Sequence, residues 1–134
     1  MTTTPSIEFV SATPNLLVSD MAVSVAFYRD VLGFRVDQTV PDEPPFVFAW
    51  LKRGGVEVFL NDVKPVAAVF PTLRAGGTSI LYVIVSDIHA LHAHLTGKAQ
   101  IVMPLTDQFY GMRECAILDP DGYLLTFAQR ISQE

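Results

Sequence analysis

The order of apolar and polar positions along the chain predicts a strand followed by a helix near its start. Residues 13–18 are mostly apolar, which favours a strand, and Ser19 or Asp20 can cap a helix that Gly33 ends. The apolar positions of this helix recur at helical spacing: Val23, Phe27, Tyr28, Val31 and Leu32. Three further strands are predicted after it, at residues 34–40, 46–51 and 56–60.

The same order returns after a segment that contains two prolines and a Gly-Gly pair. Residues 80–85 predict a strand, Ser86 or Asp87 can cap a helix, and Gly97 ends it. Strands follow at 101–105, 110–118 and 123–128. The tripeptide Val-Ser-Asp at 18–20 recurs at 85–87, a shift of 87 − 20 = 67, and the turn glycines Gly55 and Gly122 are also 122 − 55 = 67 apart. One constant shift between matching residues predicts that the chain contains the same structural unit twice.

Two strand-helix-strand-strand-strand units predict an α+β fold. Each unit has one helix for one face of its sheet, so the other face must be covered by the partner unit, a ligand or another subunit. The chain has 134 residues, the length of one domain. Hydrophobic residues make up 50% of it, yet apolar runs such as 80–85 are too short to span a bilayer. We therefore expect a soluble protein whose surplus apolar surface forms an oligomer interface or an apolar pocket.

Charge and cysteine content narrow the possible partners. The formal net charge is -5 and the nine basic residues are scattered, so we expect no nucleic-acid partner. The first residues lack the basic and apolar regions of a signal peptide. The one cysteine, Cys115, cannot form an internal disulfide and is interpreted as a small buried strand residue. A cytoplasmic location is therefore expected, without a membrane partner.

Two stretches of the chain carry a family resemblance. LLVSDMAVSVAFYRDVLGF and YGMRECAILDPDGYLLTF resemble the opening and closing signatures of the vicinal oxygen chelate superfamily, which includes glyoxalase I, extradiol dioxygenases and bleomycin-resistance proteins. The resemblance covers about residues 11–130. It implies a single domain over 1–134, with module 1 at about 11–61, a linker at 62–77 and module 2 at about 78–130. The implied fold is a curled mixed sheet of two βαβββ modules, with the helices outside and a concave cavity inside.

Enzymes of this superfamily hold a divalent metal in that cavity with His, Glu or Gln side chains. The family's spacing carries the four ligand positions onto Thr13, Phe59, Ile80 and Thr126. Two hydroxyls and two side chains without donor atoms do not form a ligand set for Zn²⁺, Ni²⁺ or Fe²⁺. We therefore expect neither a metal nor another cofactor. The register of the fourth strand is open, because Glu57 lies two residues from Phe59 and could be the inward residue.

The resemblance also places Met112, Glu114 and Ala116 on the cavity side of the strand before the last turn. A carboxylate in an apolar cavity loses solvation unless a cation or a hydrogen-bond donor meets it. One interpretation is a ligand that is basic or donates a hydrogen bond. The other is an internal salt bridge with one of three basic residues, Arg35, Lys52 and Arg53.

Aromatic residues leave a similar choice open. Phe46, Phe48 and Trp50 alternate along one predicted strand and share a face, and Tyr110 lies in the loop that enters the last hairpin. They either pack against the first helix or line the cavity and stack on a flat ligand, as aromatic side chains do in bleomycin-resistance proteins. The second helix carries three histidines that we interpret as surface residues away from the cavity: His89, His92 and His94.

Together, these patterns predict a metal-independent small-molecule-binding protein of the glyoxalase/bleomycin-resistance type that sequesters an aromatic or cationic drug or metabolite. The resemblance implies a homodimer with its grooves between subunits. The alternative is a lyase, isomerase or dioxygenase of the superfamily that acts on a small substrate in the same cavity, with misplaced metal ligands or with Glu114 as acid or base. No catalytic residue is assigned. The predicted ligand-binding residues are Phe46, Phe48, Trp50, Phe59, Tyr110, Met112, Glu114 and Thr126.

Overall fold

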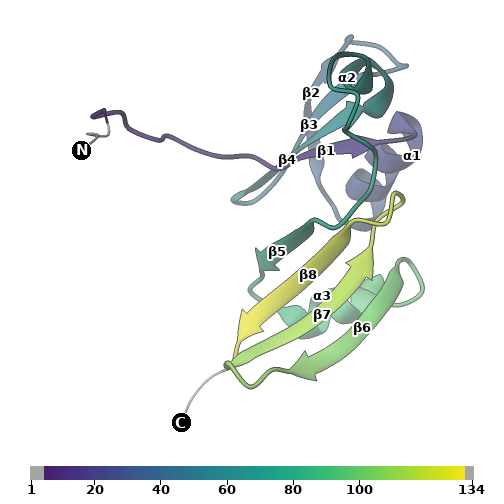
Figure 1. Cartoon of the computed structure of the whole chain (residues 1–134). Coiled ribbons are helices and arrows are strands. Elements are labelled where there is room, and N and C mark those ends of the chain that lie inside the picture. The colour runs from purple at the N-terminus through teal and green to yellow at the C-terminus, as the bar shows by residue number, and fades with distance from the viewer. Residues whose placement is uncertain (1–4, 132–134) are drawn as a thin grey trace.

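The computed structural model describes residues 5–131 and contains two βαβββ modules (Figure 1). Module 1 consists of β1 (Asn15–Val18), α1 (Met21–Ala26), the π-helical turn η1 (Phe27–Val31), β2 (Arg35–Val40), β3 (Phe48–Arg53) and β4 (Val56–Asp62). Helix α2 (Val63–Val69) follows it. Module 2 consists of β5 (Ile80–Ile84), α3 (Ile88–Leu95), β6 (Gln100–Asp107), β7 (Met112–Leu118) and β8 (Leu124–Arg130). The predicted α+β fold of two modules is confirmed.

Each module forms its own four-stranded mixed sheet. The strand order is β1-β4-β3-β2 in module 1 and β5-β8-β7-β6 in module 2, and only the β1–β4 and β5–β8 pairs are parallel. Asn15 lies opposite Phe59 in the first sheet, and Tyr82 lies opposite Thr126 in the second. Both residues of the second pair are 67 positions after those of the first, so the sequence repeat is also a repeat of strand register. The two sheets do not close on each other within one chain.

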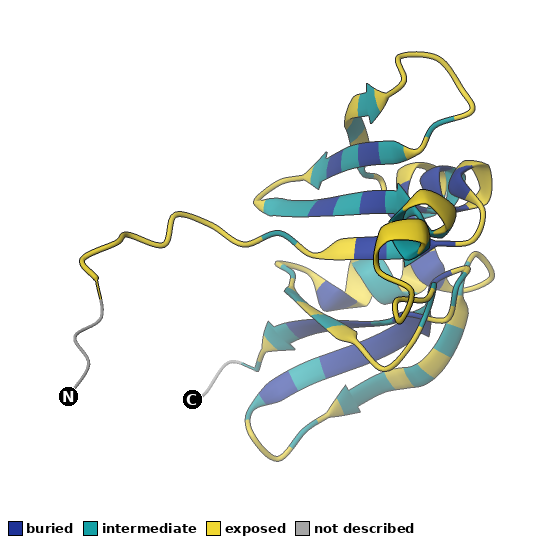
Figure 2. Ribbon diagram, turned by 45° about the horizontal axis from the view of Figure 1, so that its top comes forward, coloured by how far each residue is buried: buried dark blue, intermediate teal, exposed yellow. Residues whose placement is uncertain are grey.

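The helices of each module cover one side of its sheet, here called the outer side, and leave the opposite side, the inner face, uncovered. Burial alternates along β3 and β5 accordingly, whereas in the central strands β7 and β8 residues of both faces are buried (Figure 2). In module 1 the outer side of the sheet includes Leu51 and Leu60, which are fully buried together with Tyr28 of η1. In module 2, Ile117 and Leu95 of α3 are buried in the same way. The inner faces therefore carry the residues available for binding.

Equivalent aspartates begin the main helix of each module. The Asp20 carboxylate accepts a hydrogen bond of 3.1 Å from the backbone N–H of Val23, and Asp87 accepts one of 3.1 Å from Ala90. Both side chains satisfy backbone donors that the first helical turn leaves unpaired. The sequence prediction of two capped helices is confirmed at these positions. The prediction did not include the π-helical turn over the last five residues of the first helix.

The Asp-Pro-Asp-Gly turn of module 2 joins it to module 1. The Asp121 carboxylate accepts a hydrogen bond of 2.6 Å from the Ser19 hydroxyl, just before α1. The Tyr28 hydroxyl donates to the buried Asp119 carboxylate at 2.8 Å, and Tyr123 donates to the Leu17 carbonyl at 2.8 Å. Burial raises the pKa of Asp119 and, with the neighbouring Asp119 charge, that of Tyr28. This turn therefore fixes how the two modules pack.

Several element boundaries differ from those that the sequence predicted. The strand predicted at 46–51 begins at Phe48, three residues after Pro45, and the strand predicted at 110–118 begins at Met112. Gly111 adopts a φ of +86°, and its N–H donates to the Gln108 carbonyl and closes a turn. Strand β7 therefore begins only after this turn. The predicted linker contains α2, which Asp62 caps through the Lys64 N–H.

Residues 5–14 form an extended segment that projects away from both modules (Figure 1). Its apolar side chains are largely exposed, with Phe9 at 94% exposure. Among the residues that the structure describes, none of the helices has the length and apolar character needed to cross a bilayer.

Candidate functional site

The inner face of module 2 carries a buried carboxylate at its centre. Glu114 lies in β7 and is only 3% exposed. Its register partner is Ala128, and the next inner pair along the same two strands is Ala116 and Thr126. These neighbours are small and, like the acid, buried, so Glu114 lies among side chains that offer it little solvation. Met112 shares this face and is also buried.

Two tyrosine hydroxyls converge on one oxygen of this acid. Tyr82 of β5 donates to Glu114 Oε2 at 2.5 Å, and Tyr110 of the β6–β7 loop donates to the same atom at 2.8 Å. Desolvation and the bond to Glu114 raise the pKa of Tyr82 to about 12. The bond to Glu114, followed by desolvation, raises the pKa of Tyr110. Both hydroxyls therefore remain protonated donors near neutral pH, and both rings stand about half exposed above the acid.

Of the two interpretations of Glu114, the internal salt bridge is wrong, because each of the three candidate cations contacts another group. Arg35 and Lys52 pair with Asp37 at 3.2 and 3.6 Å, and Arg53 donates to the Leu32 carbonyl at 2.6 Å. Across residues 5–131, no Lys or Arg side chain forms an ion pair with Glu114. The carboxylate is thus held by neutral donors only, and its charge has no protein counter-ion in direct contact.

The inner face of module 1 carries an aromatic cluster instead. The ring centroid of Phe59 lies 5.2 Å from that of Phe48 and 5.5 Å from that of Trp50, in edge-on geometry. The Trp50 indole N–H donates to Glu57 at 2.7 Å, and the Lys52 ammonium lies 4.7 Å from the centre of the indole ring. This is a rigid stacking surface with one cation at its edge.

Strand register answers the question about the fourth strand. Phe59 pairs with Trp50, and Glu57 pairs with Lys52, so Phe59 and Glu57 both lie on the inner face of β4. Phe46 does not continue the row of Phe48 and Trp50. It precedes the strand and packs against the hydrophobic core, which contradicts the expected shared face.

The four positions that correspond to the family's metal ligands do not lie opposite one another in the strand pairs. Thr13 lies in the extended segment before β1, and Ile80 is at the exposed start of β5. The side chains directly opposite Phe59 and Thr126 are Asn15 and Tyr82, two residues further along each opening strand than the family spacing implies. Neither set fits a divalent metal, because both consist of neutral or apolar side chains and the nearby Glu57 is bonded to Trp50.

Other acidic and histidine side chains do not supply a metal site either. Within the described part of the chain, no group of three or more His, Cys, Asp or Glu residues is arranged to hold an ion. On α3, His89 lies 3.0 Å from the Arg113 guanidinium and His94 lies 2.7 Å from the Val31 carbonyl, both on the outer side. Arg113 itself pairs with Asp107 at 2.6 Å.

A groove of about 810 Å³ runs between the two modules at the edges of both inner faces. Asn15 and Glu57 line it from module 1, and Ile80, Tyr82 and Ile84 line it from module 2. The sequence analysis missed Asn15 and Tyr82. The signal for Tyr82 was present, because it lies on the same side of β5 as Ile80 and 67 positions after Asn15.

Comparison with known proteins identifies the family. The sequence profile of the Glyoxalase/Bleomycin resistance protein/Dioxygenase superfamily matches residues 9–127, so the chain belongs to this superfamily. A bleomycin resistance protein from Geobacillus stearothermophilus is 32% identical over 132 residues, a match that covers 88% of this chain and 95% of that protein. An uncharacterized protein from Mycobacterium bovis is 28% identical over 126 residues, which cover 90% of this chain and 83% of that protein.

Solved structures share the fold. TioX from Micromonospora sp. ML1 superposes with a TM-score of 0.74 at 26% identity, covering 90% of this chain and all of that chain. A glyoxalase/bleomycin resistance protein/dioxygenase from Nocardioides reaches a TM-score of 0.77 at 21% identity, covering 96% of this chain and 89% of that chain.

Proposed function

We propose that the chain is a metal-independent small-molecule-binding protein of the glyoxalase/bleomycin-resistance type. Its ligand is a flat aromatic molecule that carries a positive charge or a strong hydrogen-bond donor. In this proposal the ligand's charged group contacts Glu114, and its ring stacks on the cluster of Phe48, Trp50 and Phe59. Binding alone would protect a cell by sequestering a toxic compound. A cytoplasmic location belongs to the same proposal and is supported by the single free thiol, Cys115, which is buried.

The observation that carries this proposal is that Glu114 is buried and bonded only to neutral donors. A glutamate that is only 3% exposed normally has a cation or several donors around its carboxylate. Here its known partners are two tyrosine hydroxyls on a single oxygen, and both rings are half exposed. A cationic ligand would therefore gain a strong ion pair in a weakly solvated place.

The shapes of the two inner faces support a homodimer. Phe48 pairs with Asn61, and Glu114 pairs with Ala128, while Asn61 and Ala128 are equivalent through the 67-residue shift. Phe48 in module 1 therefore stands where Glu114 stands in module 2. By the same pairing, Trp50 and Phe59 correspond to Ala116 and Thr126. A face with large aromatic side chains and a face with small side chains around a buried acid would be complementary in shape.

Within one chain these two faces belong to separate sheets, so we propose that a second copy brings them together. The exposed edge of β5 supports this arrangement, because Ile80 and Ile84 are 60% and 62% exposed. The 32% identity with bleomycin resistance proteins supports a ligand of that general kind. Module 1 of one copy would then form each groove with module 2 of the other.

The proposal is tested by ligand-induced thermal stabilisation. Purified protein is melted with bleomycin, mitomycin-type compounds and other aromatic cations, each with and without added divalent metals. A ligand that binds only the folded state raises the Tm by mass action. Glu114→Gln, which keeps the shape but removes the charge, should abolish most of the shift. Glu43→Gln, in the exposed β2–β3 loop, should leave it unchanged.

Three results would contradict this function. Stoichiometric retention of Zn²⁺, Ni²⁺, Mn²⁺ or Fe²⁺ after dialysis would favour a metal-dependent enzyme of the superfamily. Product formation that Glu114→Gln abolishes, with ligand affinity retained, would favour a metal-free lyase or isomerase. A monomer in sedimentation experiments, with undiminished ligand binding, would exclude grooves between subunits.

A further inference from the structure

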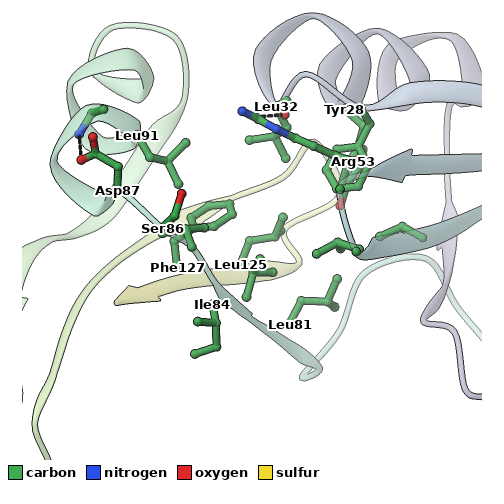
Figure 3. A pocket seen from close by; sticks show the side chains of 18 residues that line it. Tyr28, Leu32, Arg53, Leu81, Ile84, Ser86, Asp87, Leu91, Leu125 and Phe127 are labelled. Atoms are coloured by element: carbon green, nitrogen blue, oxygen red, sulfur yellow. Dashed lines mark hydrogen bonds between the residues drawn. The ribbon is translucent and has the colours of Figure 1, made fainter. Parts of the chain in front are cut away.

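A second cavity lies on the outer side of the two sheets and adjoins the groove between the modules, with which it shares lining residues: Gly55, Val56, Leu81, Val83 and Ile84. It measures about 500 Å³ and is bounded by α3 and β5 of module 2 and by η1 and the β3–β4 hairpin of module 1. Figure 3 shows Leu91 of α3 and its capping residue Asp87 on one wall and Leu32 and Arg53 on the other, with Leu125 and Phe127 beneath. None of the predicted ligand-binding residues lines this cavity.

The cavity exists because module 2 does not fill a space that module 1 fills. Leu16 and Val18 on the outer side of β1 are 4% and 0% exposed. Their equivalents in β5 are Val83 and Val85, since 16 + 67 = 83 and 18 + 67 = 85, and both are only partly buried. Equivalent aliphatic side chains are therefore closely packed in module 1 but border a cavity in module 2.

Two differences between the helices account for this void. Helix α1 with η1 spans Met21–Val31, whereas α3 ends at Leu95 after eight residues. The buried Val25 of α1 corresponds to His92 of α3, since 25 + 67 = 92, so a polar, half-buried side chain replaces a buried apolar one. An apolar void of this size is unusual in a closely packed domain, and its volume lies in the range of small-molecule sites.

Arg53 supplies charge at the mouth of the cavity. One guanidinium nitrogen, Nη1, donates to the Leu32 carbonyl at 2.6 Å, which holds the side chain in place. An arginine has five N–H donors, so the fixed guanidinium retains donors for a planar anion. The carboxylate on the opposite wall, Asp87, already accepts the Ala90 N–H as a helix cap. The Ser86 hydroxyl lies between these two walls (Figure 3).

We propose that this cavity binds a monocarboxylate with an apolar tail, such as a medium-chain fatty acid. The tail lies against Val83, Leu91, Leu125 and Phe127, and the carboxylate is held by Arg53. This site is independent of Glu114, because the two lie on opposite sides of the second sheet. The chain would then carry two ligands of opposite charge, a cation on the inner side and an anion on the outer side.

The test uses decanoate below its micelle-forming concentration, titrated into the full chain by calorimetry. Decanol and decylamine carry the same tail with a neutral and a cationic head. Decanoate should bind most tightly, about tenfold more tightly than decanol, as expected for a charge-assisted contact. Equal binding of decanol and decanoate would overturn the assignment of a carboxylate, and failure of all three to bind would overturn the cavity as a site.

Matched variants locate the binding. Ala90 lines the cavity and is exposed, so Ala90→Trp fills the space without disturbing the core and should weaken decanoate at least about tenfold. Ala93→Trp, on the same helix but away from the cavity, should change nothing. Arg53→Gln should reduce the preference for decanoate over decanol by about fivefold to tenfold, whereas Arg35→Gln should not. Equal losses from Ala93→Trp or Arg35→Gln would contradict the proposed position.

Glu114→Gln separates this inference from the proposed function. Decanoate binding should survive in Glu114→Gln with unchanged affinity, while the response to aromatic cations is lost. Loss of both responses in this one variant would contradict two independent sites.

Discussion

The two modules have the same strand order and the same register, yet they differ at equivalent positions on both sides of the sheet. On the outer side, module 1 buries Val18 completely, while module 2 leaves Val85 partly exposed beside a cavity. On the inner side, module 1 carries Phe48 where module 2 carries the acid Glu114. A repeated unit keeps its backbone pairing through the pattern of small and large apolar residues, so individual side chains are free to diverge.

This difference shows that close packing is concentrated in module 1, whereas the buried acid and the cavity belong to module 2. Module 1 fills its outer side and presents a closed aromatic surface, with Trp50 held by Glu57 and Lys52. Module 2 has a buried acid, Glu114, on its inner side and borders a cavity beside Val83 on its outer side. The two modules are joined through the turn at Asp119–Gly122, so the better packed unit supports the unit with unfilled space.

The sharpest test of this comparison replaces the same residue type at equivalent places. Val18→Ala should destabilise the protein by about 2 kcal/mol, because the side chain is fully buried and its removal leaves a void. Val85→Ala should cost less than about 1 kcal/mol, because its methyl groups already border a cavity. Urea denaturation of both variants measures the difference. Equal losses would show that module 2 packs as tightly as module 1.

The link between the modules is tested by Tyr28→Phe. This change removes the 2.8 Å bond to the buried Asp119 and should cost about 1 to 2 kcal/mol, since the carboxylate keeps only its backbone donors from Asp121 and Tyr123. Tyr123→Phe, which removes a bond to a backbone carbonyl, is the comparison variant and should cost less. A larger loss in Tyr123→Phe would contradict the central role of Asp119.

The same tyrosine predicts an effect of pH. Because burial raises the pKa of Tyr28 above its value in the unfolded chain, the folded state favours the protonated phenol. Its contribution is complete below the unfolded pKa of about 10 and is lost progressively as pH rises above that value. Tyr28→Phe should therefore lose less stability than the parent chain between pH 9 and about 11. Denaturation curves across this range provide the measurement.

On the inner side, Tyr82→Phe and Tyr110→Phe test the carboxylate. Each single variant leaves one donor on Glu114 and should cost about 0.5 to 1 kcal/mol, whereas the double variant should cost more than the sum. The equivalent of Tyr82 in module 1 is Asn15, which bonds to Asn61 and not to an acid. Asn15→Ala should therefore show no coupling to either tyrosine, as checked by double-mutant cycles.

The sequence predicted the repeated unit because apolar spacing and capping residues act locally. Asp20 and Asp87 each lie three residues before the N–H that they accept, so the helix starts were visible in the order of residues. The placement of Phe46 was missed because strand alternation does not show where a strand begins after Pro45. The partners of Glu114 were missed because Tyr82 is 32 residues away and reaches the acid only through the β5–β8–β7 order.

The smallest expected effect concerns Lys52, which has no counterpart on the inner face of module 2. Its ammonium lies 4.7 Å from the centre of the Trp50 ring and 3.6 Å from Asp37, but its side chain is 31% exposed. Solvent screening limits both contacts, so Lys52→Met should cost only about 0.5 kcal/mol at low salt and less at high salt. Lys64→Met, on the exposed surface of α2, should show no such salt dependence. Denaturation at two salt concentrations distinguishes them. If Lys52→Met is instead neutral at every salt concentration, the aromatic face of module 1 is held by its ring contacts and by Glu57 alone.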